Sequence, residues 1–408
     1  VADINNDNYP DIIASGVNNS SLLTGKIYMN GKKDFLFTER TSNITAIRGG
    51  EVNIIDFNND GYNDILVTGK NINDAYITEI YKNNSGVSFT LFTSLNGLYY
   101  SSSVIGDFNN DGFPDIILSG LDAGSAFRTL YYINNAGSGF AVNNTNLPNT
   151  NKGSMSALNL TNDGKPDILI SGYTMSGPVT FIYNNNTVAS NTRPDAPLNL
   201  SSYSLNDSVI LRWNLSHDTE TLPKGLTYDF YIKKASSGSP VFTAPSDYST
   251  GDRYVFKQGG LQDTFIVIKN MPNGKYYWSV QAVDQGYKGS AFAAQTEFNI
   301  CHNLNIGRDT SICKGSSIVL AAGNSSDIVN WYSSENPSLS FHNGNTATVD
   351  VFQNSKIWAI VGTSIGCTLS DTINLFVLPL PQTNLKSDTG VCIHSNLSLS
   401  LDQSGYLG

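Results

Sequence analysis

Four short segments of the chain share one arrangement of acidic and amide side chains. Each has Asp or Asn at its first position and oxygen-bearing side chains at its third, fifth and ninth positions. These side chains are Asp3, Asn5, Asp7 and Asp11 in the first segment; Asp56, Asn58, Asp60 and Asp64 in the second; Asp107, Asn109, Asp111 and Asp115 in the third; and Asn159, Thr161, Asp163 and Asp167 in the fourth. Oxygen ligands at alternate positions of a tight turn suit a hard cation such as Ca²⁺, which takes about six to eight oxygens. The segments are therefore predicted to be calcium loops.

The remaining positions of each loop support this prediction. A backbone carbonyl at the seventh position is expected to be a further ligand, from Tyr9, Tyr62, Phe113 and Lys165 in the four loops. The sixth position has to turn sharply, with positive φ, and it carries Gly61, Gly112, Gly164 or Asn8, the residue types that tolerate this conformation. The second position is apolar in every copy, so we expect Ile4, Phe57, Phe108 and Leu160 to pack into the protein.

The four loops are not equivalent, and they are not EF-hands. Three Asp residues in each of the first three loops outweigh the charge of one Ca²⁺, whereas the fourth has Asn159 and Thr161 at its first and third positions. The fourth loop is expected to bind most weakly. No Glu stands at the twelfth position, as an EF-hand requires. Mg²⁺ fits less well because it usually keeps several waters. One such segment alone could equally be a turn, since Asp, Asn and Gly favour turns.

The loops recur at a fixed spacing. They begin at residues 3, 56, 107 and 159, which are 51 to 53 residues apart, and a period of this size is typical of propeller blades. Within a period we expect four short antiparallel strands: one before the loop (residues 52–55), one after it (65–69), one ending in Tyr-x-Asn (79–83) and one after a turn (88–92). The fold class is therefore all-β, with a partial β-propeller over residues 1–190.

A different organisation follows the last loop. Pro194 and Pro197 stiffen a linker, and strand-like runs between residues 195 and 300 predict a β-sandwich. Residues 301–381 form a third predicted unit. The segment at Asp388 repeats the one at Asp309 after 79 residues, so residues 382–408 are expected to begin another copy. All four cysteines, Cys301, Cys313, Cys367 and Cys392, lie in this last part without a Cys-x-x-Cys pair, which favours disulfides over zinc.

The overall composition excludes some classes of partner. With 24 Lys and Arg against 34 Asp and Glu, the formal net charge of −10 would repel a phosphate backbone, so no nucleic-acid partner is expected. No apolar run of about 18 residues predicts a membrane span, and no signal peptide is visible. The chain opens and stops inside repeats, so we interpret it as a fragment.

The loops resemble the FG-GAP/VCBS repeats of integrin alpha-subunit propellers, over about residues 1–190. This resemblance implies a ring of about seven blades, of which about four are present, and calcium that braces the ring. Residues 195–300 resemble a fibronectin type III domain, in which Trp213, Tyr276 and Trp278 would pack in the core. Residues 301–381 resemble the PKD-like or immunoglobulin-like repeats of secreted bacterial surface proteins, and this resemblance implies a disulfide between Cys313 and Cys367. Cys301 and Cys392 have no evident partner in the sequence.

These features favour a secreted or cell-surface binding scaffold, with the blades recognising an extracellular protein or glycan and the sandwiches acting as spacers. The ligand cannot be identified from the sequence. A lectin that uses Tyr99, Tyr100 and Tyr131 is one alternative, and the non-catalytic part of a larger polysaccharide-degrading enzyme is another. The chain is not expected to be an enzyme itself, because no catalytic motif occurs and all four histidines (His217, His302, His342 and His394) lie outside the blades.

Overall fold

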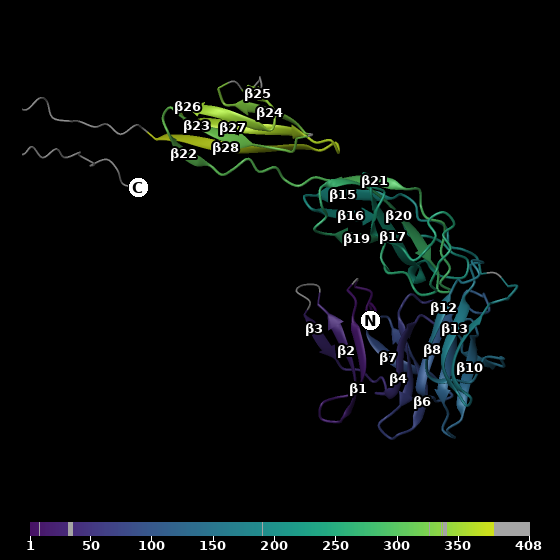
Figure 1. Ribbon diagram of the computed structural model, residues 1–408. Coiled ribbons are helices and arrows are strands. Elements are labelled where there is room, and N and C mark those ends of the chain that lie inside the picture. The colour runs from purple at the N-terminus through teal and green to yellow at the C-terminus, as the bar shows by residue number, and fades with distance from the viewer. Residues whose placement is uncertain are drawn as a thin grey trace, which may run out of the picture. The chain divides into compact units, whose positions relative to one another are not determined.

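The computed structural model describes residues 1–7, 9–31, 36–189, 191–325, 327–335, 337 and 341–378. They fall into two compact units: Val1–Met271 with Lys275–Phe298, and Pro272–Gly274 with the residues that follow from Asn299 (Figure 1). Apart from one short 3₁₀ turn, η1 (Pro223–Gly225), every regular element in these residues is a strand. The predicted all-β class is confirmed.

Four small antiparallel sheets, here called blades 1 to 4, follow one another at the start of the first unit (Figure 1). Blade 1 contains β1 (Ile12–Val17), β2 (Leu23–Asn30) and β3 (Phe37–Arg40); blade 2 contains β4 (Arg48–Ile55), β5 (Asp64–Lys70), β6 (Tyr76–Asn84) and β7 (Ser88–Leu95). Blade 3 contains β8 (Tyr99–Gly106), β9 (Asp115–Leu121), β10 (Phe127–Asn134) and β11 (Phe140–Asn143), and blade 4 contains β12 (Asn151–Leu158), β13 (Asp167–Thr174) and β14 (Gly177–Tyr183). Neighbouring strands within each sheet are consecutive in sequence, which is a meander.

The second strand of each blade explains why the sheets stack. In β5 and β9 nearly every residue is buried, because one face packs on the preceding blade and the other on the following blade. Phe57, Ile80 and Ile116 lie in one hydrophobic cluster that joins blades 2 and 3. The first strands also meet: Ser103 Oγ in β8 donates to Glu51 Oε2 in β4 at 2.9 Å.

The predicted four-strand pattern is confirmed in blades 2 and 3, but it is wrong for blades 1 and 4, where the described residues form three strands each. After β14 the chain turns toward the preceding blade instead of pairing with β14. Thr187 Oγ1 donates to the carbonyl of Asn109 at 3.4 Å, and Asn110 Nδ2 donates to the carbonyl of Ala189. These bonds hold the start of the linker against blade 3.

Two further sheets of the first unit form a sandwich, here called the first sandwich. One sheet has the order β15 (Ser201–Leu205), β16 (Ser208–Arg212), β19 (Phe265–Ile268); the other has the order β18 (Pro240–Phe242), β17 (Thr227–Lys234), β20 (Gly274–Val283), β21 (Thr296–Ile300). This arrangement of three and four strands is the one expected for a fibronectin type III-like domain. Trp213, Tyr276 and Trp278 are all buried, which confirms their predicted place in the core.

The first sandwich and the blades share a hydrophobic core. The segment that leads to β19 pairs with β12, since Val255 forms a β-bridge with Leu158 and Phe256 donates its amide to the carbonyl of Ala157 at 3.3 Å. Phe256 and Tyr287 are buried in the cluster of blades 3 and 4. The blades and the first sandwich belong to one compact unit, so no boundary between them is observed. The predicted domain boundaries 1–190 and 195–300 therefore stay predictions.

The second unit is another sandwich. Its larger sheet has the order β22 (Thr310–Cys313), β28 (Thr368–Leu378), β27 (Ser355–Gly362), β24 (Ile328–Ser333), β25 (His342–Asn343), and its smaller sheet pairs β23 (Ser316–Ala321) with β26 (Thr346–Val351). Trp331 is fully buried between the sheets and donates through Nε1 to the carbonyl of Gly344 at 2.8 Å. The strand order is immunoglobulin-like. The predicted repeat at residues 382–408, with Cys392, lies outside the described residues.

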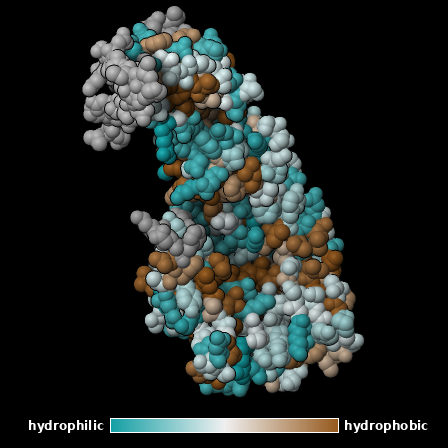
Figure 2. Space-filling view, turned by 60° about the vertical axis from the view of Figure 1, so that its left-hand side comes forward, coloured by the Kyte–Doolittle hydropathy of each residue, from teal (hydrophilic) through white to brown (hydrophobic). Residues whose placement is uncertain are grey.

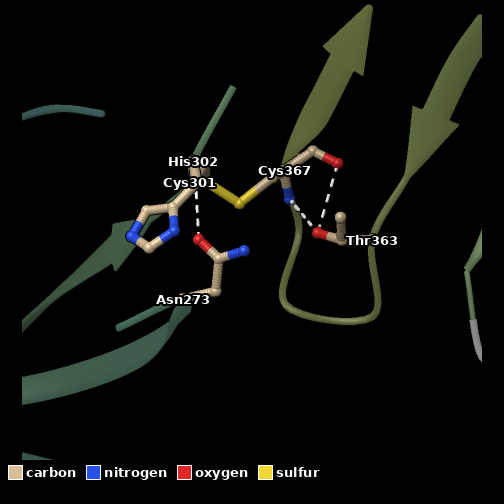
Figure 3. The surroundings of a disulfide bond; sticks show 5 residues. All are labelled: Asn273, Cys301, His302, Thr363 and Cys367. Atoms are coloured by element: carbon tan, nitrogen blue, oxygen red, sulfur yellow. Dashed lines mark hydrogen bonds between the residues drawn. A yellow bond between two sulfur atoms is a disulfide. The ribbon is translucent and has the colours of Figure 1, made fainter. Parts of the chain in front are cut away.

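The predicted disulfide between Cys313 and Cys367 is wrong. Cys367 is bonded to Cys301, with 6.1 Å between the Cα atoms (Figure 3). Cys313 pairs with Leu378 at the far end of β28, whereas Cys367 immediately precedes β28. At about 3.3 Å per residue the length of this strand separates Cys313 and Cys367 far beyond the reach of a disulfide. Among the described cysteines, Cys313 alone is a free thiol, and it is exposed.

Candidate metal centre

The predicted calcium loops are here called metal loops, and three of them lie between the first and second strands of a blade. Metal loops 2, 3 and 4 (residues 56–64, 107–115 and 159–167) connect β4 to β5, β8 to β9 and β12 to β13, and metal loop 1 (residues 3–11) precedes β1. The loops therefore lie at the same end of the four blades.

The first acidic residue of each loop shapes its turn. In metal loop 2, Asp56 accepts the amide of Asp60 on Oδ1 at 3.0 Å and the amide of Gly61 on Oδ2 at 2.8 Å. Asp107 accepts the equivalent two amides, from Asp111 and Gly112, at 2.9 and 2.8 Å. In metal loop 1 the amide of Asp7 donates to Asp3 at 3.1 Å. One carboxylate thus bends the chain around itself in each of these loops.

The third and fifth positions are neighbours in space. Asn58 donates through Nδ2 to Asp60 Oδ2 at 3.1 Å, and the pairs Asn5–Asp7 and Asn109–Asp111 make the same contact. The fifth-position carboxylate also accepts the amide of the seventh residue; the donors are Tyr9, Tyr62, Phe113 and Lys165. The loop brings the third, fifth and seventh residues to one side of the turn.

The ninth-position Asp is buried and connects its loop to the third strand of its own blade. Asp64 accepts the amide of Phe57 on Oδ2 at 3.3 Å and the amide of Asn83 on Oδ1 at 2.7 Å. Asp11, Asp115 and Asp167 accept the corresponding pairs of amides. This residue anchors the loop whether or not it also binds a metal.

The backbone has two left-handed positions in these loops, of which the sequence pattern predicts only the sixth. The sixth position has positive φ at Gly61 (84°), Gly112 (89°) and Gly164 (77°), as predicted; Asn8 lies outside the described residues. The fourth position is also left-handed, at Asn6 (56°), Asn59 (55°), Asn110 (61°) and Asn162 (57°). The signal was present in the sequence, because all four copies have Asn there, a residue that tolerates this conformation.

The fourth-position Asn also connects one loop to the next. Asn6 Nδ2 donates to the carbonyl of Gly61 at 2.8 Å, and Asn59 Nδ2 donates to the carbonyl of Gly112 at 3.2 Å. Each acceptor is the sixth residue of the following loop. Hydrogen bonds therefore join metal loop 1 to metal loop 2 and metal loop 2 to metal loop 3.

Metal loop 4 differs from the others in its contacts as well as in its sequence. Asn159 accepts the amide of Gly164 at 3.3 Å, but its Nδ2 is buried without a hydrogen-bond partner among the described residues. Leu160 is 48 % exposed, so the expectation that the second position is always buried is wrong here. Ile4, Phe57 and Phe108 are buried as predicted. Blade 4 has no described blade after it to cover Leu160.

Burial and crowding of like charges raise the pKa of several loop carboxyls. Burial raises the pKa of Asp64 to about 9, and the charges of Asp56 and Asp60 raise it further against the amide bond from Asn83. Burial also raises the pKa of Asp56, Asp107 and Asp115 to about 7 in each case. A nearby cation favours the ionised form of such carboxyl groups and so opposes the rise in their pKa.

The donors fit Ca²⁺ in chemical type. They are carboxylate, amide and carbonyl oxygens, and the buried Oδ1 of Asn5 has no hydrogen-bond partner among the described residues. Within the described part of the chain, no three His, Cys, Asp or Glu side chains are grouped so that they could hold a metal ion by themselves. An ion in these loops therefore needs the predicted amide and carbonyl oxygens at the third and seventh positions.

The first sandwich covers metal loops 2 and 3. A Cβ atom at Gly61 would lie 2.6 Å from the carbonyl oxygen of Lys224, and one at Gly286 would lie 2.8 Å from Asp107 Oδ2. Lys224 and Lys288 bring positive charge near Asp56 and Asp107. The loops are thus part of an interface inside the first unit.

The three tyrosines proposed for a lectin site are engaged in contacts within the protein. Tyr131 is buried and donates to Asp115 Oδ2 at 2.8 Å. The rings of Tyr99 and Tyr100 are in contact, tilted by 34° with centroids 4.0 Å apart, and Lys70 and Lys152 lie over them at 4.6 and 4.5 Å. These contacts join blades 2, 3 and 4 and occupy ring faces that a sugar would need.

The blades carry a recognisable repeat. Residues 3–67, 56–118 and 107–170 match the FG-GAP-like repeat, so the N-terminal part of the chain consists of FG-GAP-like repeats. These matches cover the three complete loop-to-loop periods. No curated protein matches the chain.

Several solved structures of β-sandwich proteins are similar to parts of the chain. The chicken CNTN1 FN1–FN3 domains are 10 % identical, cover 52 % of this chain and 78 % of that one, and give a TM-score of 0.21. The fibronectin(III)-like modules of Clostridium thermocellum CbhA are 12 % identical, with coverages of 46 % and 96 % and a TM-score of 0.16. Extracellular domains 3–5 of Drosophila OTK are 11 % identical, with coverages of 52 % and 71 % and a TM-score of 0.24. At these TM-scores the similarity carries no conclusion about the chain, and the sandwich folds are defined by the strand orders described above.

Proposed function

We propose that the chain is part of an extracellular, non-catalytic binding scaffold whose blades are braced by Ca²⁺. The observation that carries this proposal is the coupling of the metal loops. Metal loops 1 to 3 each fold around the carboxylate of their first residue, and the fourth-position Asn residues of loops 1 and 2 bond the next loop. Calcium in one loop would therefore stiffen its neighbours as well as its own blade.

In metal loops 1 to 3 the ion would be held by the first, third, fifth and ninth side chains and the seventh carbonyl. Bound Ca²⁺ would supply positive charge to buried carboxyls that the protein otherwise holds at a raised pKa. Lys82 Nζ lies 3.3 Å from Asp60 Oδ2 and shares the negative charge of metal loop 2. Metal loop 4 is proposed as the weakest site, because its first position is the neutral Asn159.

An extracellular location is proposed from two features. The disulfide between Cys301 and Cys367 is typical of oxidising compartments. Extracellular free calcium can also fill sites with dissociation constants of about 10⁻⁴ to 10⁻³ M. Among the described residues no helix is long and apolar enough to cross a membrane.

The binding surface itself is proposed to be for an extracellular protein or glycan. A cavity of about 1080 Å³ lies between the first strands of blades 2 to 4 and the first sandwich, and Val52, Ile105 and Phe256 are among its lining residues. On the face shown in Figure 2, hydrophobic side chains gather in patches between hydrophilic ones. The aspartates in the cavity lining, Asp3 and Asp7, belong to metal loop 1, so the proposed role is binding rather than catalysis.

Calorimetric titration of the metal-depleted chain with Ca²⁺ tests the proposal. We expect binding at up to four sites, with the weakest lost on substitution of Asp163, and a rise in melting temperature that a chelator reverses. Titration with Mg²⁺ under the same conditions is the control for ion selectivity. Absence of heat with Ca²⁺, together with an unchanged melting temperature, would contradict a calcium-braced scaffold.

A further inference from the structure

Three side chains meet where the linker after the blades passes over the first sandwich. Asn191 in the linker donates through Nδ2 to Asp284 Oδ2 at 2.7 Å. Lys288 donates through Nζ to the backbone carbonyl of the same Asn191 at 2.7 Å. Asp284 and Lys288 belong to the turn after β20, in which the amide of Lys288 donates to Asp284 Oδ1 at 2.7 Å. An amine, a carboxamide and a carboxyl group are thereby held together.

The site is enclosed. Asn191 is 3 % exposed and Asp284 is 1 % exposed, and a Cβ atom at Gly286 would lie 2.7 Å from Asn191 Nδ2. Glycine at that position therefore lets the carboxamide enter the turn. Bulk water has little access to these groups, so hydrolysis competes only weakly with a reaction between them.

The carboxamide has an unsatisfied atom. Asn191 Oδ1 is buried without a hydrogen-bond partner among the described residues. Burial raises the pKa of Asp284 well above its usual value, so its carboxyl group, which contacts Nδ2, can take up a proton and carry it to that nitrogen.

The amine is also partly withdrawn from water. Burial lowers the pKa of Lys288, which favours the neutral, nucleophilic form; Asp284, Asp107 and Asp252 oppose this effect, and Arg193 supports it. Lys288 Nζ already contacts the backbone carbonyl of Asn191. To reach Cγ, it has to move only from the backbone to the side chain of the same residue.

We propose that Lys288 and Asn191 form an intramolecular isopeptide bond. The ammonium group of Lys288 gives a proton to the carboxylate of Asp284, and the neutral Nζ attacks Cγ of Asn191. The Nζ–Cγ bond forms and the Cγ–Nδ2 bond breaks. Asp284 passes its proton to the leaving nitrogen, which departs as ammonia and takes up the second Nζ proton to become ammonium. No oxidant, reductant or added cofactor is consumed.

Such a bond would join the linker directly to the first sandwich. The linker starts against blade 3. The bond would therefore connect the blades covalently to the first sandwich, which covers metal loops 2 and 3. This inference does not depend on calcium binding.

Intact-mass spectrometry of the purified chain tests the proposal. We expect a mass lower than that of the sequence, after allowance for the disulfide, by one molecule of ammonia. Proteolysis should then yield a branched peptide in which residues around Lys288 are attached to residues around Asn191. A chain with the full mass and two separate linear peptides would overturn the proposal.

Substitutions distinguish isopeptide formation from other reactions that release ammonia. Succinimide formation at Asn191 gives the same mass change but does not need Lys288. The variant Lys288→Arg keeps the positive charge and should restore the full mass, as should Asp284→Asn, which removes the proton carrier. The matched control Lys224→Arg changes another lysine of the same interface and should keep the lower mass. A loss of ammonia that persists in Lys288→Arg would show a succinimide and contradict the isopeptide.

Discussion

Asn134, the last residue of β10, donates through Nδ2 to the backbone carbonyl of Phe57 in the preceding blade at 2.8 Å. The same side chain donates to the carbonyl of Pro114 at 3.1 Å and accepts the amide of Gly137 at 2.8 Å. Asn83 and Asn185 bond the carbonyls of Ile4 and Phe108 in the same way. One residue type at one place in the repeat thus ties each of metal loops 1 to 3 to the next blade.

The first prediction concerns this connection. Asn134→Ala leaves the buried Phe57 carbonyl without its donor, and an unsatisfied buried group costs about 1–3 kcal/mol. We expect the free energy of unfolding to fall by about this amount, measured by urea denaturation. Asn30→Ala is the matched control, because among the described residues Asn30 Nδ2 donates only to Pro10 in its own blade. An equal loss in both variants would contradict a connection between blades.

The second prediction concerns the weakest metal loop. Asn159 Nδ2 is buried without a partner, whereas Asp56 and Asp107 each use the equivalent atom to accept the amide of the fifth residue. Asn159→Asp would supply that acceptor and one negative charge. We expect calorimetric titration to show tighter calcium binding at one site, by about tenfold for each 1.4 kcal/mol gained.

The control for this variant is Asn151→Asp, which also adds one charge to blade 4 but lies at the other end of β12. It should leave calcium binding unchanged. If both substitutions tighten binding equally, the gain comes from net charge and not from a ligand in the loop.

The repeat and the loops could be predicted from the sequence because they depend on local residue types. Alternating oxygen side chains and Gly at the sixth position specify a turn, and a fixed spacing specifies a repeated sheet. The bond from Asn134 to Phe57 could not be predicted, although the recurring Asn was visible, because it depends on how one blade stacks on the next. The exposure of Leu160 could not be predicted for the same reason, because its burial depends on a neighbouring blade.

The disulfide shows a similar limit. The resemblance implies a pair because Cys313 lies near the start of the unit and Cys367 near its end. The parallel pairing of β22 with β28 instead places Cys313 beside the last residue of β28, whereas Cys367 precedes its first residue. Cys301 follows β21 and reaches the turn before β28, where Cys367 donates its amide to Thr363 Oγ1 at 2.9 Å (Figure 3). Strand register decided the partner, and the sequence alone does not reveal register between distant strands.

The third prediction tests the disulfide. Cys301→Ser opens a loop with a sequence separation of 66 residues, so we expect the second unit to lose about 4 kcal/mol of stability. Hydrogen exchange with mass spectrometry would show faster exchange in β27 and β28 and little change in the blades. Cys313→Ser is the control and should change neither, because that thiol is exposed and unbonded.

The fourth prediction tests whether the first sandwich packs on metal loop 2. Gly61→Ala and Gly164→Ala both place a side chain at positive φ, which costs about 1–2 kcal/mol. Only Gly61 faces a backbone closely, with Lys224 O 2.6 Å from a Cβ atom; at Gly164 the nearest atom is Asp252 Oδ1 at 3.2 Å. We expect Gly61→Ala to cost about 1 kcal/mol more in urea denaturation. Equal costs would mean that the sandwich does not rest on this loop.

The fifth prediction concerns pH. In the metal-free protein the pKa of Asp64 is raised from 3.8 to about 9, and those of Asp56, Asp107 and Asp115 are raised to about 7. Between the ordinary pKa of 3.8 and the raised pKa of each group, the folded state binds more protons than the unfolded state. The free energy of unfolding therefore falls as pH rises through this range. With a chelator, the melting temperature should therefore decrease from about pH 4 toward pH 9.

Calcium should weaken or reverse this trend, because the ion binds the ionised carboxylates and replaces the protons. Melting curves at matched pH values, with excess Ca²⁺ or with a chelator, give the comparison. The difference between the two melting temperatures should widen as pH rises through about 7, where protons no longer compete with the ion. The variant Asp64→Asn, which cannot ionise, should show a flatter profile with the chelator. A difference that stays constant across this range would mean that these carboxyls do not hold the calcium.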